Sequence, residues 1–225
     1  MRQGIFILML LGGFLDLSAQ PVVSYISGKC TFKDSTGTLI TSEYFDACSS
    51  FYEGFAIVIK SDKRGFIGLN GEIKIPFFYD DATAFNEGVA AVASNGKYGY
   101  IDYQGKIVLP FIYDIAAPFE NGIAVVKINN EKFFIDNRGK KIFTNGFEDA
   151  RQFKEGLAAV RQEGKWGYIN INGDLVIPFQ YDDSFDFFTD GSAIIVVDNN
   201  EYLINKNGIV IKELVPRWRL EKKKG

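Results

Sequence analysis

Short runs of β-branched and aromatic residues, three to a set, alternate with polar turns along most of the chain. In one set the runs cover 91–93, 98–102 and 106–109, and such runs between turn residues are typical of strands. Asn-Gly favours a two-residue hairpin turn because both residues tolerate positive φ. We therefore expect such turns between the second and third runs of a set, at Asn70-Gly71, Asn172-Gly173 and Asn207-Gly208.

The same pattern recurs at an offset of 34 residues, which predicts a tandem repeat. Glycine stands at several fixed points of each copy and would interrupt a helix, so helical repeats of this period are excluded. The residues that recur in register are Phe51, Phe85, Phe119 and Phe153; Gly54, Gly88, Gly122 and Gly156; Gly37, Gly71, Gly105, Gly139, Gly173 and Gly208; and Pro76, Pro110 and Pro178.

The repeat predicts an all-β tandem array of about six three-stranded antiparallel units, each followed by a loop through Pro-Phe and Tyr-Asp. We expect an open or superhelical stack, with a closed propeller-like ring as the alternative. The last copy loses its proline and Tyr-Asp, and no strand exchange between the end copies is indicated. The predicted copies cover about 20–50, 51–84, 85–118, 119–152, 153–186 and 187–216.

One hexapeptide gives the array a family likeness. Segment 164–169 reads GKWGYI and segment 96–101 reads GKYGYI, while 63–67 is a weaker version. With these motifs the chain resembles the bacterial WG (KWG) repeat family. The resemblance implies a β-rich array not known for catalysis, which presents an interaction surface in exported or interaction-prone bacterial proteins.

The signature residues are interpreted as structural. A glycine beside a large aromatic lets a neighbouring backbone or ring lie close to the strand. The aspartate of Tyr-Asp is expected to bond its own loop backbone. The residues so interpreted are Gly65, Tyr98, Gly99, Trp166, Gly167, Asp80, Asp114 and Asp182.

The two ends of the chain lie outside the predicted repeat copies and indicate a signal peptide and a basic tail. Arg2 and the apolar run 5–15 precede a predicted cleavage site after Ala19, as in a signal peptide. The run is too short for a membrane span, which needs about 20 residues. Residues 217–225 form a basic tail, interpreted as a solvated end or, alternatively, an attachment to anionic lipid or envelope polymer. We expect an exported product that is periplasmic, cell-surface or secreted, with no integral membrane segment after cleavage.

The composition excludes several kinds of catalytic and metal-binding centre. The chain has no histidine, which excludes Ser-His-Asp and Cys-His centres and histidine-ligated metals. Cys30 and Cys48 are the only cysteines; they either form a disulfide in an oxidising compartment or stay as separate buried thiols. A net charge of −3 gives no sign of nucleic-acid binding. We expect no catalytic, cofactor-binding or metal-ligating residues.

The resulting function hypothesis is an exported, non-enzymatic scaffold for a protein or envelope partner. The alternative is a carbohydrate-binding module that stacks sugars on exposed rings such as Tyr98 and Trp166. A third hypothesis, a hydrolase with paired carboxylates, requires two acidic groups that converge in one cleft.

Overall fold

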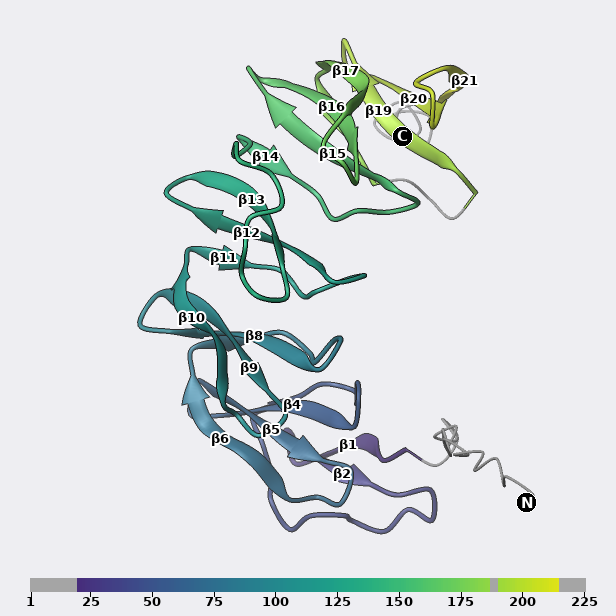
Figure 1. Cartoon of the computed structure of the whole chain (residues 1–225). Helices are drawn as coiled ribbons and strands as arrows, with labels where there is room; N and C mark the ends of the chain where they lie inside the picture. The colour runs from purple at the N-terminus through teal and green to yellow at the C-terminus, as the bar shows by residue number, and fades with distance from the viewer. Residues whose placement is uncertain (1–19, 187–189, 215–225) are drawn as a thin grey trace, which may run out of the picture.

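The computed structural model describes residues 20–186 and 190–214, and these contain strands and turns but no helix. Six small antiparallel sheets follow one another along an open arc (Figure 1). The predicted leader 1–19 and tail 217–225 lie outside the described residues. Within the ranges that are described, no helix long and apolar enough to span a membrane occurs.

Each sheet is a simple meander of consecutive strands, four of them in the regular copies. The first sheet has β1 (Val22–Ile26) and β2 (Lys29–Lys33). The second has β3 (Ala47–Cys48), β4 (Phe55–Lys60), β5 (Lys63–Gly68) and β6 (Ile73–Tyr79). The third has β7 (Asp81–Ala82), β8 (Val89–Ser94), β9 (Lys97–Asp102) and β10 (Ile107–Tyr113).

The other three sheets repeat this plan with one shorter member. The fourth has only β11 (Ile115–Ala116), β12 (Ile123–Ile128) and β13 (Glu131–Asp136). The fifth has β14 (Asp149–Ala150), β15 (Leu157–Gln162), β16 (Lys165–Asn170) and β17 (Leu175–Tyr181). The sixth has β18 (Asp183–Ser184), β19 (Ser192–Val197), β20 (Asn200–Asn205) and β21 (Val210–Leu214).

The all-β open array is therefore confirmed, with one difference in the units. Each regular sheet gains a fourth, two-residue strand such as β7, which pairs with β8 and precedes the Phe-x-x-Gly turn. Sequence patterning misses it because two residues are too few to show alternation. The third sheet consequently begins at Asp81, ahead of the boundary predicted at 85.

The two-residue turns with two positive φ angles lie one hairpin earlier than expected. Asn95 and Gly96, between the first and second long strands, have φ of 52° and 74°. At the predicted Asn172-Gly173 turn only the glycine has positive φ, so that prediction is wrong. The cause is the Asn170 side chain, whose Oδ1 accepts the N–H groups of Asn172 and Asp174 at 3.0 Å. Such an Asx turn lets the strand reverse with one left-handed residue.

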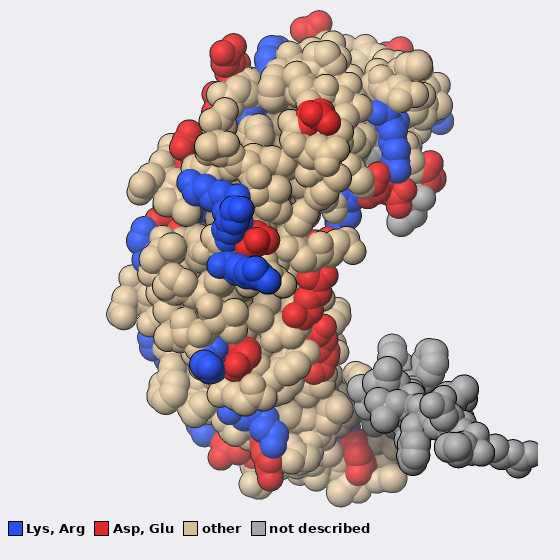
Figure 2. Space-filling model, in the orientation of Figure 1, with Lys and Arg blue, Asp and Glu red and all other residues tan. Residues whose placement is uncertain are grey.

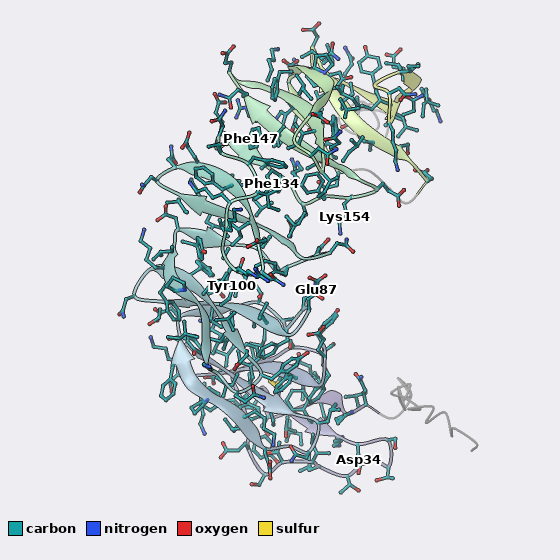
Figure 3. All side chains as sticks on the ribbon, in the orientation of Figure 1. Asp34, Glu87, Tyr100, Phe134, Phe147 and Lys154 are labelled. Atoms are coloured by element: carbon teal, nitrogen blue, oxygen red, sulfur yellow. A yellow bond between two sulfur atoms is a disulfide. The ribbon has the colours of Figure 1, made fainter. Side chains whose placement is uncertain are left out.

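The core lies in the seams between successive sheets. In the first four seams a ring from the second long strand packs on the phenylalanine of the next Phe-x-x-Gly turn. The ring centroids of Tyr100 and Phe119 are 4.8 Å apart, and those of Phe134 and Phe153 are 4.9 Å apart. Tyr100 is fully buried, with its hydroxyl donating to the Ala117 carbonyl at 2.6 Å (Figure 3). Each sheet therefore depends on its neighbour to cover its apolar face.

Glutamates along the inner edge of the arc join neighbouring sheets. The Glu53 carboxylate accepts the N–H groups of Glu87 and Gly88 at 2.9 and 3.1 Å. Glu87 in turn accepts the N–H groups of Asn121 and Gly122, one repeat further on. Figure 2 shows acidic side chains gathered along this hollow edge, where Figure 3 labels Glu87. These bonds satisfy exposed turn donors and fix the spacing of successive sheets.

Candidate functional site

The signature glycines allow the third long strand to lie against the second. A Cβ atom at Gly65, Gly99 or Gly167 would lie 2.6, 2.8 or 2.6 Å from a carbonyl oxygen of that strand. The register of the third strand shifts there, next to Pro76, Pro110 or Pro178. A proline suits this bulge because the ladder needs no N–H from it. Glycine and proline thus serve a single contact between adjacent strands.

Three copies lack that glycine, and their third strands differ. Thr31, Phe133 and Tyr202 occupy its position, and none of these copies has the proline. In the copies with Thr31 and Phe133, the chain that follows β2 or β13 pairs with that strand only through isolated bridges. After Tyr202, β21 pairs with residues 201–203 in unbroken register. A side chain at the glycine position therefore prevents the close, bulged approach.

A pocket opens where Phe133 replaces the glycine. It has a volume of about 1010 Å³ and lies between segment 141–147 and the sheet β14–β17. Four phenylalanine rings line it together with several polar side chains. The Lys141 ammonium lies 3.2 Å from the centroid of the Phe133 ring. Figure 3 labels Phe134 and Phe147 at this junction. We call this pocket the groove; its main lining residues are Phe133, Phe143, Phe147, Phe179, Leu175, Thr144, Asn145, Gln162 and Asn172.

The rings that a carbohydrate-binding module would need are not openly displayed. Trp166 is only 5% exposed, and Arg151 lies over its ring with the guanidinium carbon 5.1 Å from the centroid. Tyr98 is half-buried, and its hydroxyl donates to Asp81 at 2.6 Å. This hydrogen bond raises the pKa of Tyr98 to about 12. Both rings therefore belong to the packing of the array.

The recurring aspartates accept hydrogen bonds from a lysine of the preceding sheet and from a hairpin turn of the following sheet rather than from their own loop, so that expectation is wrong. Asp80 accepts from the Lys63 ammonium and from the Asn95 N–H, the latter at 3.0 Å. The hydrogen bond from Lys63 lowers the pKa of Asp80 below its usual value. Asp114 and Asp182 make the corresponding bonds to a lysine and to the next hairpin turn. The Asn95 turn is close to Asp80 because β7 pairs with β8, whereas Lys63 belongs to β5 of the preceding sheet.

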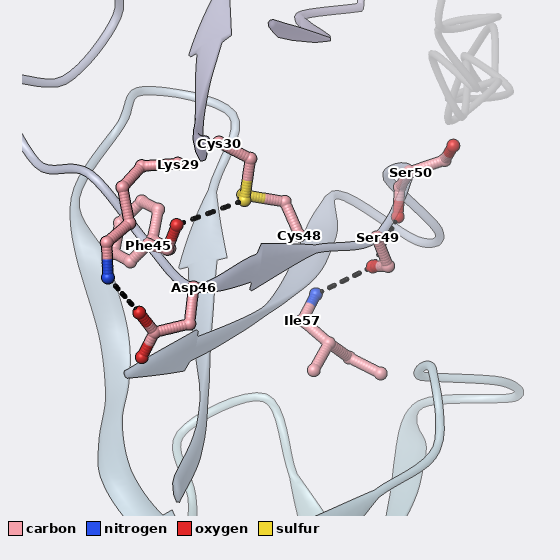
Figure 4. The surroundings of a disulfide bond; sticks show 8 residues. All are labelled: Lys29, Cys30, Phe45, Asp46, Cys48, Ser49, Ser50 and Ile57. Carbon is pink, nitrogen blue, oxygen red and sulfur yellow. Dashed lines mark hydrogen bonds and ion pairs between the residues drawn. A yellow bond between two sulfur atoms is a disulfide. The ribbon is translucent and has the colours of Figure 1, made fainter. Parts of the chain in front are cut away.

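Cys30 and Cys48 form a disulfide that joins β2 of the first sheet to β3 of the second (Figure 4). Cys30 is fully buried. Beside it, Lys29 pairs with Asp46, and the Ser49 hydroxyl accepts the Ile57 N–H at 2.8 Å (Figure 4). The disulfide lies in the same kind of seam that lysine–aspartate pairs span elsewhere.

Sequence reasoning missed the groove and the glutamates of the inner edge. The glutamates leave a signal, because Glu53, Glu87 and Glu155 all precede the glycine of a Phe-x-x-Gly turn. The groove also leaves a signal in the sequence, because one internal copy lacks both the signature glycine and the proline. Within the described residues, no group of three or more cysteine or acidic side chains is placed to hold a metal ion.

Solved structures similar to this one are β-propeller-like repeat proteins. BamB from Moraxella catarrhalis matches with a TM-score of 0.53 and 13% identity over 88% of this chain and 70% of that chain. Kluyveromyces lactis Hsv2 matches with a TM-score of 0.51 and 11% identity, over 84% and 72% of the two chains. A eukaryotic initiation factor matches with a TM-score of 0.56 and 10% identity, over 88% and 63%. At these identities the likeness shows the fold alone.

The sequence comparisons agree with the repeat seen in the structure. No curated protein sequence matches the chain. The family described as "WG containing repeat" matches it five times in tandem, at residues 31–63, 65–98, 98–131, 133–166 and 166–202. These matches cover most of the chain, which therefore belongs to the WG containing repeat family.

Proposed function

We propose that this protein is an exported, non-enzymatic scaffold that binds a segment of a protein partner in the groove beside segment 141–147. One observation carries the proposal: the groove forms where an internal copy departs from the repeat. The recurring residues are engaged in packing and turns, so recognition falls to residues that differ between copies. Thr144 and Asn145, both exposed at the rim, are such residues.

The lining of the groove suits an extended peptide that presents polar groups as well as apolar anchors. Phe143, Phe147 and Phe179 supply aromatic surface, and Gln162 and Asn172 supply amide donors and acceptors. Binding energy at protein interfaces concentrates in apolar side chains held in pockets with a polar rim. A pocket of about 1010 Å³ has room for more than one such side chain.

Export is supported by two features of the chain. Residues 1–19 have the composition of a signal peptide. The disulfide between Cys30 and Cys48 is of a kind that persists in oxidising compartments and is rare in the reducing cytosol. We place the mature protein in the periplasm, at the cell surface or outside the cell.

A pull-down from the native envelope fraction tests the binding function, with the mature chain as bait. The groove variant Thr144→Arg/Asn145→Arg adds two charges at the rim. The control is Ser42→Arg, because Ser42 is exposed and holds the same place in the first copy as Thr144 in the fourth. Captured proteins are then purified and their affinities measured.

We expect at least one captured protein whose affinity falls tenfold or more with the groove variant and is unchanged with the control. Equal affinity for the wild type and the groove variant contradicts the proposal. Capture of a polysaccharide that the groove variant also retains contradicts it as well, and supports an envelope-polymer role instead.

A further inference from the structure

A smaller pocket lies in the seam between the second and third sheets, near the disulfide. Its volume is about 270 Å³. Its walls are mostly apolar and come from β3 and β4 on one side and β7 on the other. We call it the socket; it is lined by Ala47, Cys48, Ser49, Ile57, Ile59, Arg64, Asp81 and Ala82.

The position of Arg64 in the repeat is the position of the signature tryptophan. Arg64 follows Lys63 and precedes Gly65, as Trp166 follows Lys165 and precedes Gly167. Trp166 is buried and packs in one cluster with Ala159, the residue that corresponds to Ile57. In the fifth sheet, therefore, an indole fills the seam position that the socket occupies in the second sheet.

The Arg64 side chain does not fill this space. Its Nη1 donates to the Asp62 carbonyl at the hairpin tip at 2.9 Å. Its Nε lies 3.8 Å from Asp81 Oδ1 on the next sheet. A guanidinium needs such polar partners, so the side chain extends toward the turn and leaves the apolar walls uncovered.

The burial of equivalent residues shows independently that the space is unfilled. Ala82 is half-buried, whereas Ala116, Ala150 and Ser184 at the same position are 5%, 3% and 0% exposed. The opposite wall of the socket is also more exposed than the equivalent positions of other sheets. Ile57 is also half-buried, although Ala91, Val125 and Ala159 at its position are buried.

We infer that the socket binds a tryptophan side chain of a protein partner, which takes the place that Trp166 fills within the chain. An indole buries on the order of 150–250 Å² of surface and is among the commonest anchors at interfaces. Arg64 at the rim offers a cation for its face, and Asp81 offers a carboxylate acceptor for the indole N–H. The socket is separate from the groove, so failure of this inference leaves the proposed function standing.

Methyl NMR of the full mature chain tests the inference, with the Ile57 and Ile59 methyl groups as reporters. The probes are N-acetyl-tryptophanamide and the capped peptide Gly-Trp-Gly. Arg64→Trp restores the signature residue and fills the socket from within. Ala82→Leu narrows it from the opposite wall, which keeps the test open if Arg64→Trp does not fold. Arg64→Lys is the matched control that leaves the socket empty.

Both probes should shift the Ile57 and Ile59 signals saturably in the wild type and in Arg64→Lys. Affinity should fall at least tenfold in Arg64→Trp and in Ala82→Leu, and the indole introduced in Arg64→Trp should be shielded from acrylamide quenching. Undiminished binding by the filled variants, or an introduced indole as accessible as in the unfolded chain, overturns the inference. Binding of the free amide without the peptide overturns the assignment to a protein partner.

Discussion

Replacing Gly167 with alanine tests the packing of the signature directly. The added Cβ would lie 2.6 Å from the Ile177 carbonyl oxygen and 3.0 Å from the Phe179 nitrogen. Both atoms are backbone, so β17 must move away from β16. The φ angle of Gly167 is not in the left-handed region, and the cost therefore comes from crowding alone.

Crowding of a well-packed site typically costs about 1–3 kcal/mol. We expect the free energy of unfolding to fall by about 2 kcal/mol, because Ile177 and Tyr168 belong to the buried cluster of the seam to the sixth sheet. For a chain of this size that lowers Tm by about 4–8 °C. Chemical denaturation followed by circular dichroism measures the change.

Gly164→Ala is the matched control on the same hairpin. Gly164 has φ of 75° and open space around it, so its substitution costs backbone strain of about 1 kcal/mol without moving β17. Hydrogen exchange separates the two mechanisms: β17 amides should exchange faster in Gly167→Ala and be unchanged in Gly164→Ala. A Gly167→Ala protein with wild-type stability and wild-type exchange in β17 would show that the glycine is not needed for the close approach of the two strands.

Three further predictions concern the contacts between sheets. Reduction of Cys30–Cys48, which closes a loop with a sequence separation of 18, should lower the free energy of unfolding by about 3 kcal/mol in denaturant titrations; an unchanged midpoint would contradict this. Glu87→Gln keeps one side-chain acceptor for the next turn and Glu87→Ala keeps none, so Tm should fall less in Glu87→Gln than in Glu87→Ala. Equal losses of Tm would argue against a stabilising role of these bonds. The pKa of Asp80 is lowered in the folded protein, chiefly by Lys63, so its stabilisation is present above about pH 4 and is lost as pH falls through the folded pKa. The drop in Tm from pH 5 to pH 3 should therefore be smaller in Asp80→Asn, and an equal drop would count against the prediction.

The recurring residues made the architecture predictable. Glycine and proline in fixed register indicated short strands, and the Phe-x-x-Gly series located the rings of the seams. The match between Gly65 and Pro76 was visible in the sequence, but their contact was not. It depends on a bulge that brings two strands closer than ordinary pairing allows.

The proposed binding sites were harder to predict because they arise from departures from the repeat. Phe133 and Arg64 look like weakened copies of the signature in the sequence. Only the structure shows that Phe133 keeps segment 141–147 from closing on β13, and that the Arg64 side chain leaves a socket where Trp166 fills one. The bonds of Asp80 were also beyond sequence reasoning, because β7, which places Asp80 beside the next hairpin turn, is too short to show a pattern in the sequence.

Recurring residues hold the array together, and we propose that a departure from the repeat binds the partner. Hydrogen exchange of the mature chain, with and without a purified protein that it captures from the envelope, separates these two roles. We expect slower exchange of the bound protein, concentrated in segment 141–147 and in β17. Slower exchange confined to the turns of the inner edge, with segment 141–147 unchanged, would contradict it.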